Sequence, residues 1–240
     1  MKIAILIAGQ PRFTDDFANF LNNLEGYTTA DWFCYFTGNN QNVPENKLPK
    51  PFWKNITDVN QASAQFQSLL PENNFVRAFE LSDSDEIDLP MVPNDVPTPG
   101  YKIWYNLYKV NQLRITYQAV NIQHYDLVLR VRPDIGLTGP LNLDDINTDY
   151  LHNTIITPRN KIAGHLYYSA SSPRMCDMFA IATPNVMDIY CSMIENAASN
   201  FFTQNRTTWH TESAHALHLR NNNIFVTPGD FKISIRGDSN

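Results

Sequence analysis

The sequence predicts an α/β fold: one Rossmann-like domain around a mixed, mainly parallel sheet that helices flank. Residues 2–8 form a nearly continuous apolar run, which is typical of a parallel strand covered on both faces. A helical pattern at residues 14–24 and a second apolar strand at residues 32–36 follow, and this β-α-β order favours a parallel, right-handed unit. Because 240 residues can bury a full core, we expect a single domain.

The first half of the chain continues with helices, strands and long loops. Thr14 can cap the first helix, and apolar side chains recur along it at helical spacing (Phe17, Phe20, Leu21 and Leu24). Residues 38–54 are polar and contain prolines, which indicates a loop, and a helix near 61–70 and a strand near 75–81 follow. Residues 82–100 are acidic and rich in proline, so we expect a mobile or ligand-covering loop there.

The second half of the chain begins with the clearest helical pattern. Apolar side chains repeat along residues 101–123 at helical spacing (Ile103, Leu107, Val110, Leu113, Tyr117 and Val120). Pro184 opens a further helix, since the missing N–H of proline is tolerated at a first helical position. Another helix is predicted over 209–220, and strands are predicted over 125–134, 154–157, 176–182, 224–227 and 232–235.

Composition and charge restrict the classes of partner. A net charge of −6 and a pI near 5.4 argue against broad electrostatic capture of nucleic acid or of an anionic membrane. Cys34, Cys176 and Cys191 are odd in number and match no zinc spacing, so we expect reduced thiols in a cytoplasmic protein. Only six apolar residues follow Lys2, and no apolar run approaches the roughly 20 residues of a membrane span.

The segment from Tyr125 to Asp134 is the most informative part of the chain. It is an apolar strand that two arginines interrupt, and alternation along a strand places Arg130 and Arg132 on one face. A buried arginine is costly unless it pairs with an anion. That anion is either a protein carboxylate, such as Asp126 or Asp177, or a substrate phosphate, which suits the planar guanidinium.

Asp134 follows this strand at its carboxyl end, where open α/β sheets place their ligand sites. A carboxylate there can bind Mg²⁺ or Mn²⁺, because both ions take oxygen ligands and contact substrate phosphates. The alternative is an aspartate that caps the turn after proline. The sequence leaves both open.

Two further features are candidates for phosphate binding. The turn Gly9-Gln10-Pro11-Arg12 follows the first strand and precedes a helix N-terminus, which is a natural anion site, although an ordinary βα turn has the same pattern. On the long helix, Lys102, Asn106 and Lys109 share one face. Either that face is exposed to solvent, or one of its lysines points at a phosphate.

Acidic and histidine residues complete the candidates. Glu212 and His215 lie three residues apart on the helix predicted over 209–220, so they can converge on one ligand. Glu212 is a candidate general base, and His215 or His210 is a candidate metal ligand, while the alternative is a helix with ordinary surface histidines. Asp177 begins the strand at 176–182, where it either holds an acceptor hydroxyl or pairs with an arginine.

Taken in order, these pieces resemble a group of bacterial and viral glycosyltransferase-like proteins of the kind found in polysaccharide and lipopolysaccharide gene clusters. The resemblance runs from about residue 2 to residue 236, and its most specific piece is Arg-x-Arg-Pro-Asp at 130–134. Looser pieces lie at residues 8–12, 102–109, 177–180 and 211–219.

The resemblance implies a GT-A fold that transfers a sugar from a nucleotide-sugar donor to a hydroxyl acceptor, such as a glycan. It implies a nucleotide-binding half at 1–134 and an acceptor half at 135–240. The usual GT-A metal motif is Asp-x-Asp, and this chain has Arg132-Pro133-Asp134 at the corresponding place. Asp134 would be the metal contact, for Mn²⁺ or Mg²⁺, although Arg132 could itself neutralise the diphosphate.

The same resemblance assigns the remaining residues. Asp177 would lie near the acceptor, and Glu212 would be the base of an inverting reaction. The nucleotide would lie near the first turn, and its diphosphate near the basic side chains (Gly9, Gln10 and Arg12; Lys109, Arg130 and Arg132). A non-catalytic nucleotide- or carbohydrate-binding protein on a degenerate transferase scaffold is the alternative, and the altered Asp-x-Asp motif favours it. The oligomeric state is left open.

Overall fold

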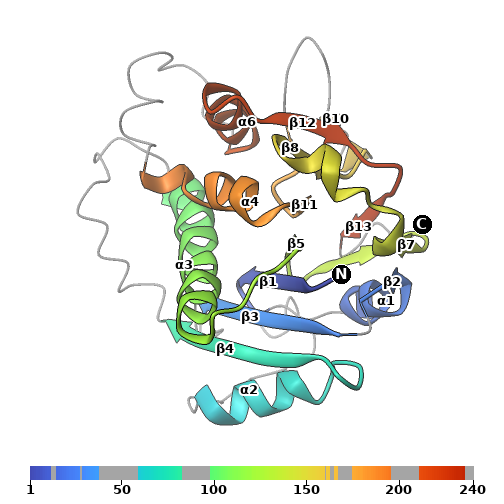
Figure 1. Ribbon diagram of the computed structural model, residues 1–240, viewed down its shortest axis with the longest axis vertical. Helices are drawn as coiled ribbons and strands as arrows, with labels where there is room; N and C mark the ends of the chain where they lie inside the picture. Colours follow the sequence, from blue (N-terminus) through green and yellow to red (C-terminus); the bar gives the residue numbers. More distant parts are fainter. Residues whose placement is uncertain are drawn as a thin grey trace.

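A computed structural model of the chain describes residues 1–11, 15–27, 29–37, 59–82, 98–159, 161–162, 165–166, 175–195 and 211–235 (Figure 1). The loop expected at 38–54 lies outside the described residues, as do residues 83–97 of the loop expected at 82–100, and Arg12, Thr14 and His210. The ends of the loop expected at 82–100 are regular structure instead, because Ser82 ends a strand and residues 98–100 begin a helix. No helix of the described ranges is long and apolar enough to cross a membrane. The three cysteines are buried and unpaired, as expected for reduced thiols.

The core of the fold is a mixed, mostly parallel seven-stranded sheet, which confirms the predicted α/β class. Strands β4, β3, β1 and β5 are parallel to one another, β11 is antiparallel to both of its neighbours, and β12 runs parallel to β8. Across the sheet the order is β12 (Phe225–Pro228), β8 (Thr154–Thr157), β11 (Phe179–Ala182), β5 (Leu127–Val131), β1 (Ile3–Gly9), β3 (Ala30–Thr37) and β4 (Phe75–Ser82).

Helices cover both faces of this sheet, because its central strands are apolar on both sides. Figure 1 shows α1 on one side and α3 and α4 on the other. Ile3, Ile5 and Ile7 pack in the cluster that includes Phe17 of α1, whereas Leu6 packs in the cluster that includes Leu107 of α3. The helices are α1 (Asp15–Asn23), α2 (Val59–Gln67), α3 (Thr98–Asn121), α4 (Pro184–Cys191) and α6 (Thr211–Asn221).

The register brings the ends of four strands to one edge of the sheet. Strands β1 and β5 pair in parallel up to Ile7 and Val131, and β1 pairs with β3 up to Gly9 and Phe36. Strand β11 runs the other way, so its first residue, Phe179, lies opposite Val131. The carboxyl ends of β3, β1 and β5 therefore meet the amino end of β11, which is where open α/β sheets bind ligands.

Several short elements were not predicted. They are the pair β2 (Leu24–Glu25) with β7 (Leu141–Asn142), the pair β9 (Lys161–Ile162) with β10 (His165–Leu166), and the 3₁₀ helices at Leu143–Asp145 and Thr148–Leu151. The strand β6 (Ile135–Leu137) was not predicted either, although its partner β13 (Ile233–Ile235) lies within the strand predicted over 232–235. The strands predicted over 125–134 and 176–182 are shorter than expected, at Leu127–Val131 and Phe179–Ala182. The trimmed residues form the turns that carry Arg132, Asp134 and Asp177.

Candidate functional site

A cavity of about 340 Å³ lies at this edge of the sheet. Its volume falls at the lower end of the range for small-molecule sites. Four of the strands described above and helix α3 supply its walls. The lining residues are Ala8 and Gly9 of β1 and Gln10 after it, Thr37 of β3, Lys102, Ile103 and Asn106 of α3, Arg130, Arg132, Pro133 and Asp134 at the end of β5, and Asp177 before β11.

Most of the site residues predicted from the sequence line this one cavity. They are Gly9, Gln10, Arg130, Arg132, Asp134 and Asp177. Glu212, Lys109 and His215 do not line it, and Arg12 lies outside the described residues. Positions far apart in the chain are thus brought together from both predicted halves, which share one sheet.

The backbone at Gly9 explains the glycine at the end of β1. Its φ is +134°, a conformation that L side chains rarely adopt and that glycine tolerates. A Cβ there would meet Pro133 Cδ at 3.9 Å, which is ordinary contact distance. The backbone conformation, and not lack of space, therefore requires glycine beside the cavity.

Arg130 is the most unusual side chain of the site, because it is only 2% exposed on strand β5. Its Nη1 donates to the backbone oxygen of Met178, but its Nε has no hydrogen-bond partner in the described part of the chain. Asp126, one of the carboxylates proposed to pair with the arginines, is instead exposed and accepts a hydrogen bond from the Lys2 backbone N at 2.6 Å. A buried donor without a partner costs about 1–3 kcal/mol, so Arg130 is suited to a ligand that accepts.

Arg132 and Asp134 form a two-bond ion pair. The Nε of Arg132 donates to Oδ1 of Asp134 at 2.8 Å, and Nη2 donates to Oδ2 at 2.5 Å. Although burial acts to lower the pKa of the guanidinium, the adjacent Asp134 carboxylate raises it overall. Arg132 thus stays charged at the cavity wall with its side chain 33% exposed.

The residues around Asp134 do not fit a divalent cation. Both carboxylate oxygens are engaged by Arg132, and a metal site needs several oxygen or nitrogen ligands. Among the described residues, no group of three His, Cys, Asp or Glu side chains is placed to hold a metal ion. The geometry therefore fits an arginine–carboxylate pair and not a metal site at these two residues.

Asp177 is a buried carboxyl group at the far wall of the cavity. It is 7% exposed, and burial raises its pKa above the ordinary value. The positive charges of Arg130 and Arg132 oppose this increase, and the nearby carboxylate of Glu212 adds to it. A carboxyl group with a raised pKa holds a proton more readily than an exposed one, which is the property that general-base catalysis uses.

Lys109 and His215 lie away from the cavity. Lys109 pairs with Glu80 at 3.5 Å and stands 5.6 Å from the ring centroid of Tyr35. Lys102, two turns earlier on the same helix, lines the cavity in its place.

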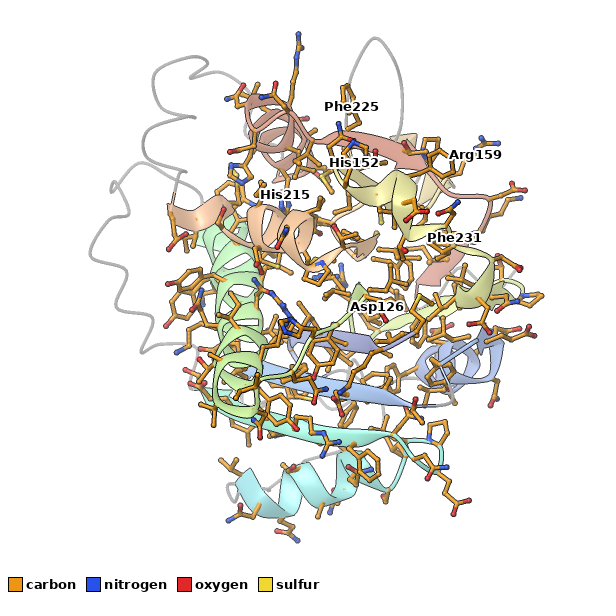
Figure 2. The ribbon with its side chains drawn as sticks, viewed as in Figure 1. Asp126, His152, Arg159, His215, Phe225 and Phe231 are labelled. Carbon is orange, nitrogen blue, oxygen red and sulfur yellow. The ribbon has the colours of Figure 1, made fainter. Side chains whose placement is uncertain are left out.

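The surface alternative for His215 is wrong, because the residue is fully buried between α6 and α4 (Figure 2). Its ring stacks on Tyr190 with centroids 4.1 Å apart, and Nε2 donates to the Tyr190 backbone oxygen at 2.8 Å. Burial lowers its pKa to about 3. His215 is therefore a neutral packing residue of the α4–α6 contact.

Two polar residues of the cavity were not predicted as binding residues. Thr37 ends β3, one residue beyond the strand expected from the sequence, and Asn106 was placed only on a shared helix face. Asn106 Nδ2 donates to Thr37 Oγ1 at 3.0 Å. Nothing in the sequence around Thr37 indicates a binding role, because its hydrogen-bond partner lies on a helix 69 residues later.

No protein family model matches this chain, and a search among curated proteins likewise finds no match. Because a fold class hosts many functions, the function has to be argued from the chemistry of the cavity.

Proposed function

We propose that this chain is a glycosyltransferase on a GT-A-like fold, which moves a sugar from a nucleotide-sugar donor to a hydroxyl acceptor. One observation carries the proposal. Basic side chains and a buried carboxyl group share one cavity at the edge where the strands β3, β1, β5 and β11 end. A transferase of this kind needs both, because it must hold a diphosphate leaving group and deprotonate an acceptor.

The basic side chains suit a diphosphate. Lys102, Arg130 and Arg132 bring three positive charges, of which Asp134 balances one, that of Arg132. The Nε of Arg130, which has no partner among the described residues, supplies a donor in a buried wall, where a charge-assisted hydrogen bond is strong. Fixed donors of this kind stabilise charge that develops on a leaving group.

Asp177 is the proposed general base. Its carboxylate accepts the proton of the acceptor hydroxyl while the acceptor oxygen forms a bond to the anomeric carbon. The bond from that carbon to the diphosphate oxygen breaks, and the leaving group takes the electron pair beside Arg130 and Arg132. Glu212 does not line the cavity, so it influences this step only electrostatically: its negative charge raises the pKa of Asp177.

The arginines are proposed to take the electrostatic role that a divalent cation has in GT-A enzymes with Asp-x-Asp. This follows from the ion pair described above, in which Asp134 holds Arg132 by two hydrogen bonds. The proposed reaction does not use a metal ion.

The same ion pair favours a second candidate, a non-catalytic nucleotide- or carbohydrate-binding protein. With the Asp-x-Asp carboxylate engaged by Arg132, the site retains the means to bind a diphosphate even if transfer has been lost. The two candidates differ in turnover and not in nucleotide affinity.

Release of nucleoside diphosphate from a panel of nucleotide-sugars tests the proposal, with glycans and water as acceptors. Asp177→Asn removes the base, and Asp126→Asn is the matched control because Asp126 is exposed and outside the cavity. We expect release by the wild type and the control but not by Asp177→Asn. Binding without release by the wild type would favour the binding protein. Absence of nucleotide binding at millimolar concentration would refute the transferase and a nucleotide-binding protein, and would leave only a carbohydrate-binding protein.

A further inference from the structure

The cavity contains one acceptor that the proposed chemistry does not use. Asn106 on α3 is 6% exposed, and its Oδ1 has no hydrogen-bond partner among the residues that the structure describes. Its Nδ2 donates to Thr37 Oγ1 at 3.0 Å, and Thr37 is 4% exposed. The threonine thus holds the amide, and both residues line the cavity.

This arrangement is poorly explained by packing alone. A buried carbonyl oxygen without a donor is unfavourable compared with an apolar side chain of similar size. Asn111, on the same helix and 2% exposed, shows the usual solution, because its Nδ2 donates to Asp188 at 2.8 Å and its Oδ1 accepts from Arg114 Nε at 2.9 Å. Asn106 Oδ1 therefore suits a ligand that donates.

The strand order places this acceptor at one end of the cavity. Thr37 ends β3, Arg130 and Arg132 come from β5, and Asp177 precedes β11, so β1 and β5 lie between Thr37 and Asp177. With neighbouring strands about 4.8 Å apart, these three spacings amount to about 14 Å. Arg130 and Arg132 therefore stand between Asn106 at one end and Asp177 at the other.

A nucleotide-sugar has the same order of parts, since its diphosphate joins a nucleoside on one side to a sugar on the other. If the diphosphate lies at the arginines and the sugar faces Asp177, the nucleoside extends toward Asn106. We infer that Asn106 Oδ1, oriented by Thr37, accepts a hydrogen bond from an O–H or N–H of the donor nucleoside and so binds the nucleoside part of the donor. This inference rests on the proposed function.

Calorimetric titration separates the nucleoside from the phosphates. Wild type, Asn106→Leu and the control Asn111→Leu would each be titrated with pyrophosphate and with UDP, GDP and ADP. For the nucleotide that binds the wild type best, we expect Asn106→Leu to bind about tenfold more weakly, the effect of one buried hydrogen bond to a ligand. Pyrophosphate affinity should not change in Asn106→Leu, and nucleotide affinity should not change in the control.

A second variant guards against misfolding of the first. Thr37→Val has nearly the same shape and leaves Asn106 in place without its hydrogen bond, so we expect about a threefold loss for the nucleotide and none for pyrophosphate. The matching 2′-deoxynucleotide distinguishes a ribose hydroxyl from a base N–H as the group that donates to Asn106. If removal of the 2′-hydroxyl weakens binding to the wild type as much as Asn106→Leu weakens binding of the complete nucleotide, the donor is the ribose.

Two results would overturn the inference. One is equal nucleotide affinity in Asn106→Leu and the wild type. The other is that Asn106→Leu weakens binding of the nucleotide and of pyrophosphate equally, which would mean that the substitution affects phosphate binding or the fold. Failure of the wild type to bind any nucleotide is a different outcome, and it would remove the proposed function as well.

Discussion

Replacement of His215 by phenylalanine should remove a measurable part of the pH dependence of stability. The histidine ring is fully buried, stacks on Tyr190 and is neutral in the folded protein. Phenylalanine keeps a ring in that position but cannot take up a proton. The comparison also tests whether His215 is a packing residue or the metal ligand suggested by its spacing from Glu212.

The magnitude follows from the pKa of His215, which burial lowers from 6.5 to about 3. As the pH falls below 6.5 the unfolded chain binds a proton that the folded chain excludes, so the contribution to stability is complete above pH 6.5 and is lost toward pH 3. The slope is about 1.4 kcal/mol per pH unit, and the loss between pH 7 and pH 5 is about 2 kcal/mol. For a chain of this length, that corresponds to about 4–8 °C in Tm.

Tm would be measured from pH 5 to pH 8 for the wild type, His215→Phe and the control His124→Phe, whose histidine is exposed. We expect the wild type to lose about 4–8 °C more than His215→Phe between pH 7 and pH 5. The control should follow the wild type. If Tm falls equally with pH in His215→Phe and the wild type, His215 does not contribute to the pH dependence and the burial account is refuted. If Mn²⁺ raises the Tm of the wild type and His215→Phe abolishes this rise, His215 is a metal ligand.

Three further outcomes are expected. Asp177→Asn should lower turnover about 10²- to 10⁴-fold without weakening nucleotide binding, measured as kcat and Kd, because it removes a base and a negative charge beside Arg130. Arg132→Lys should weaken pyrophosphate binding about tenfold in calorimetry with EDTA present, since lysine cannot form the two-bond pair with Asp134; unchanged affinity would contradict a phosphate contact. Gly9→Ala should cost about 1–3 kcal/mol in thermal unfolding because of its φ of +134°, whereas Gly139→Ala, with nothing within 4 Å, should not.

Much of the sheet was predictable because its buried strands are continuous apolar runs of strand length, which can be recognised in the sequence. The strand at Thr154–Thr157 has its predicted bounds, and the side chains of β5 alternate as expected of a strand, with Leu127, Leu129 and Val131 in one core cluster and Val128 in the other. The convergence of Gly9, Arg132 and Asp134 was also predictable, since parallel strands end at the same edge.

The remainder depends on how separate elements meet. The burial of His215 comes from the stacking of α6 on α4, which no spacing within α6 reveals. Lys109 shares a helix face with Lys102, but it lies two turns further along the helix, where it pairs with Glu80 of β4 and does not line the cavity. Strand β6 has only three residues and pairs with β13 nearly a hundred residues later, so β6 was missed although the strand at 232–235 was predicted.

The most direct test of the account is a crystal structure of the protein with the nucleoside diphosphate that binds best, grown in the presence of EDTA. We predict phosphate oxygens within hydrogen-bonding distance of Arg130 Nε and the Arg132 guanidinium, with the nucleoside toward Asn106. A nucleotide bound elsewhere on the protein, or a cavity in which Arg130 Nε contacts no ligand, would contradict it.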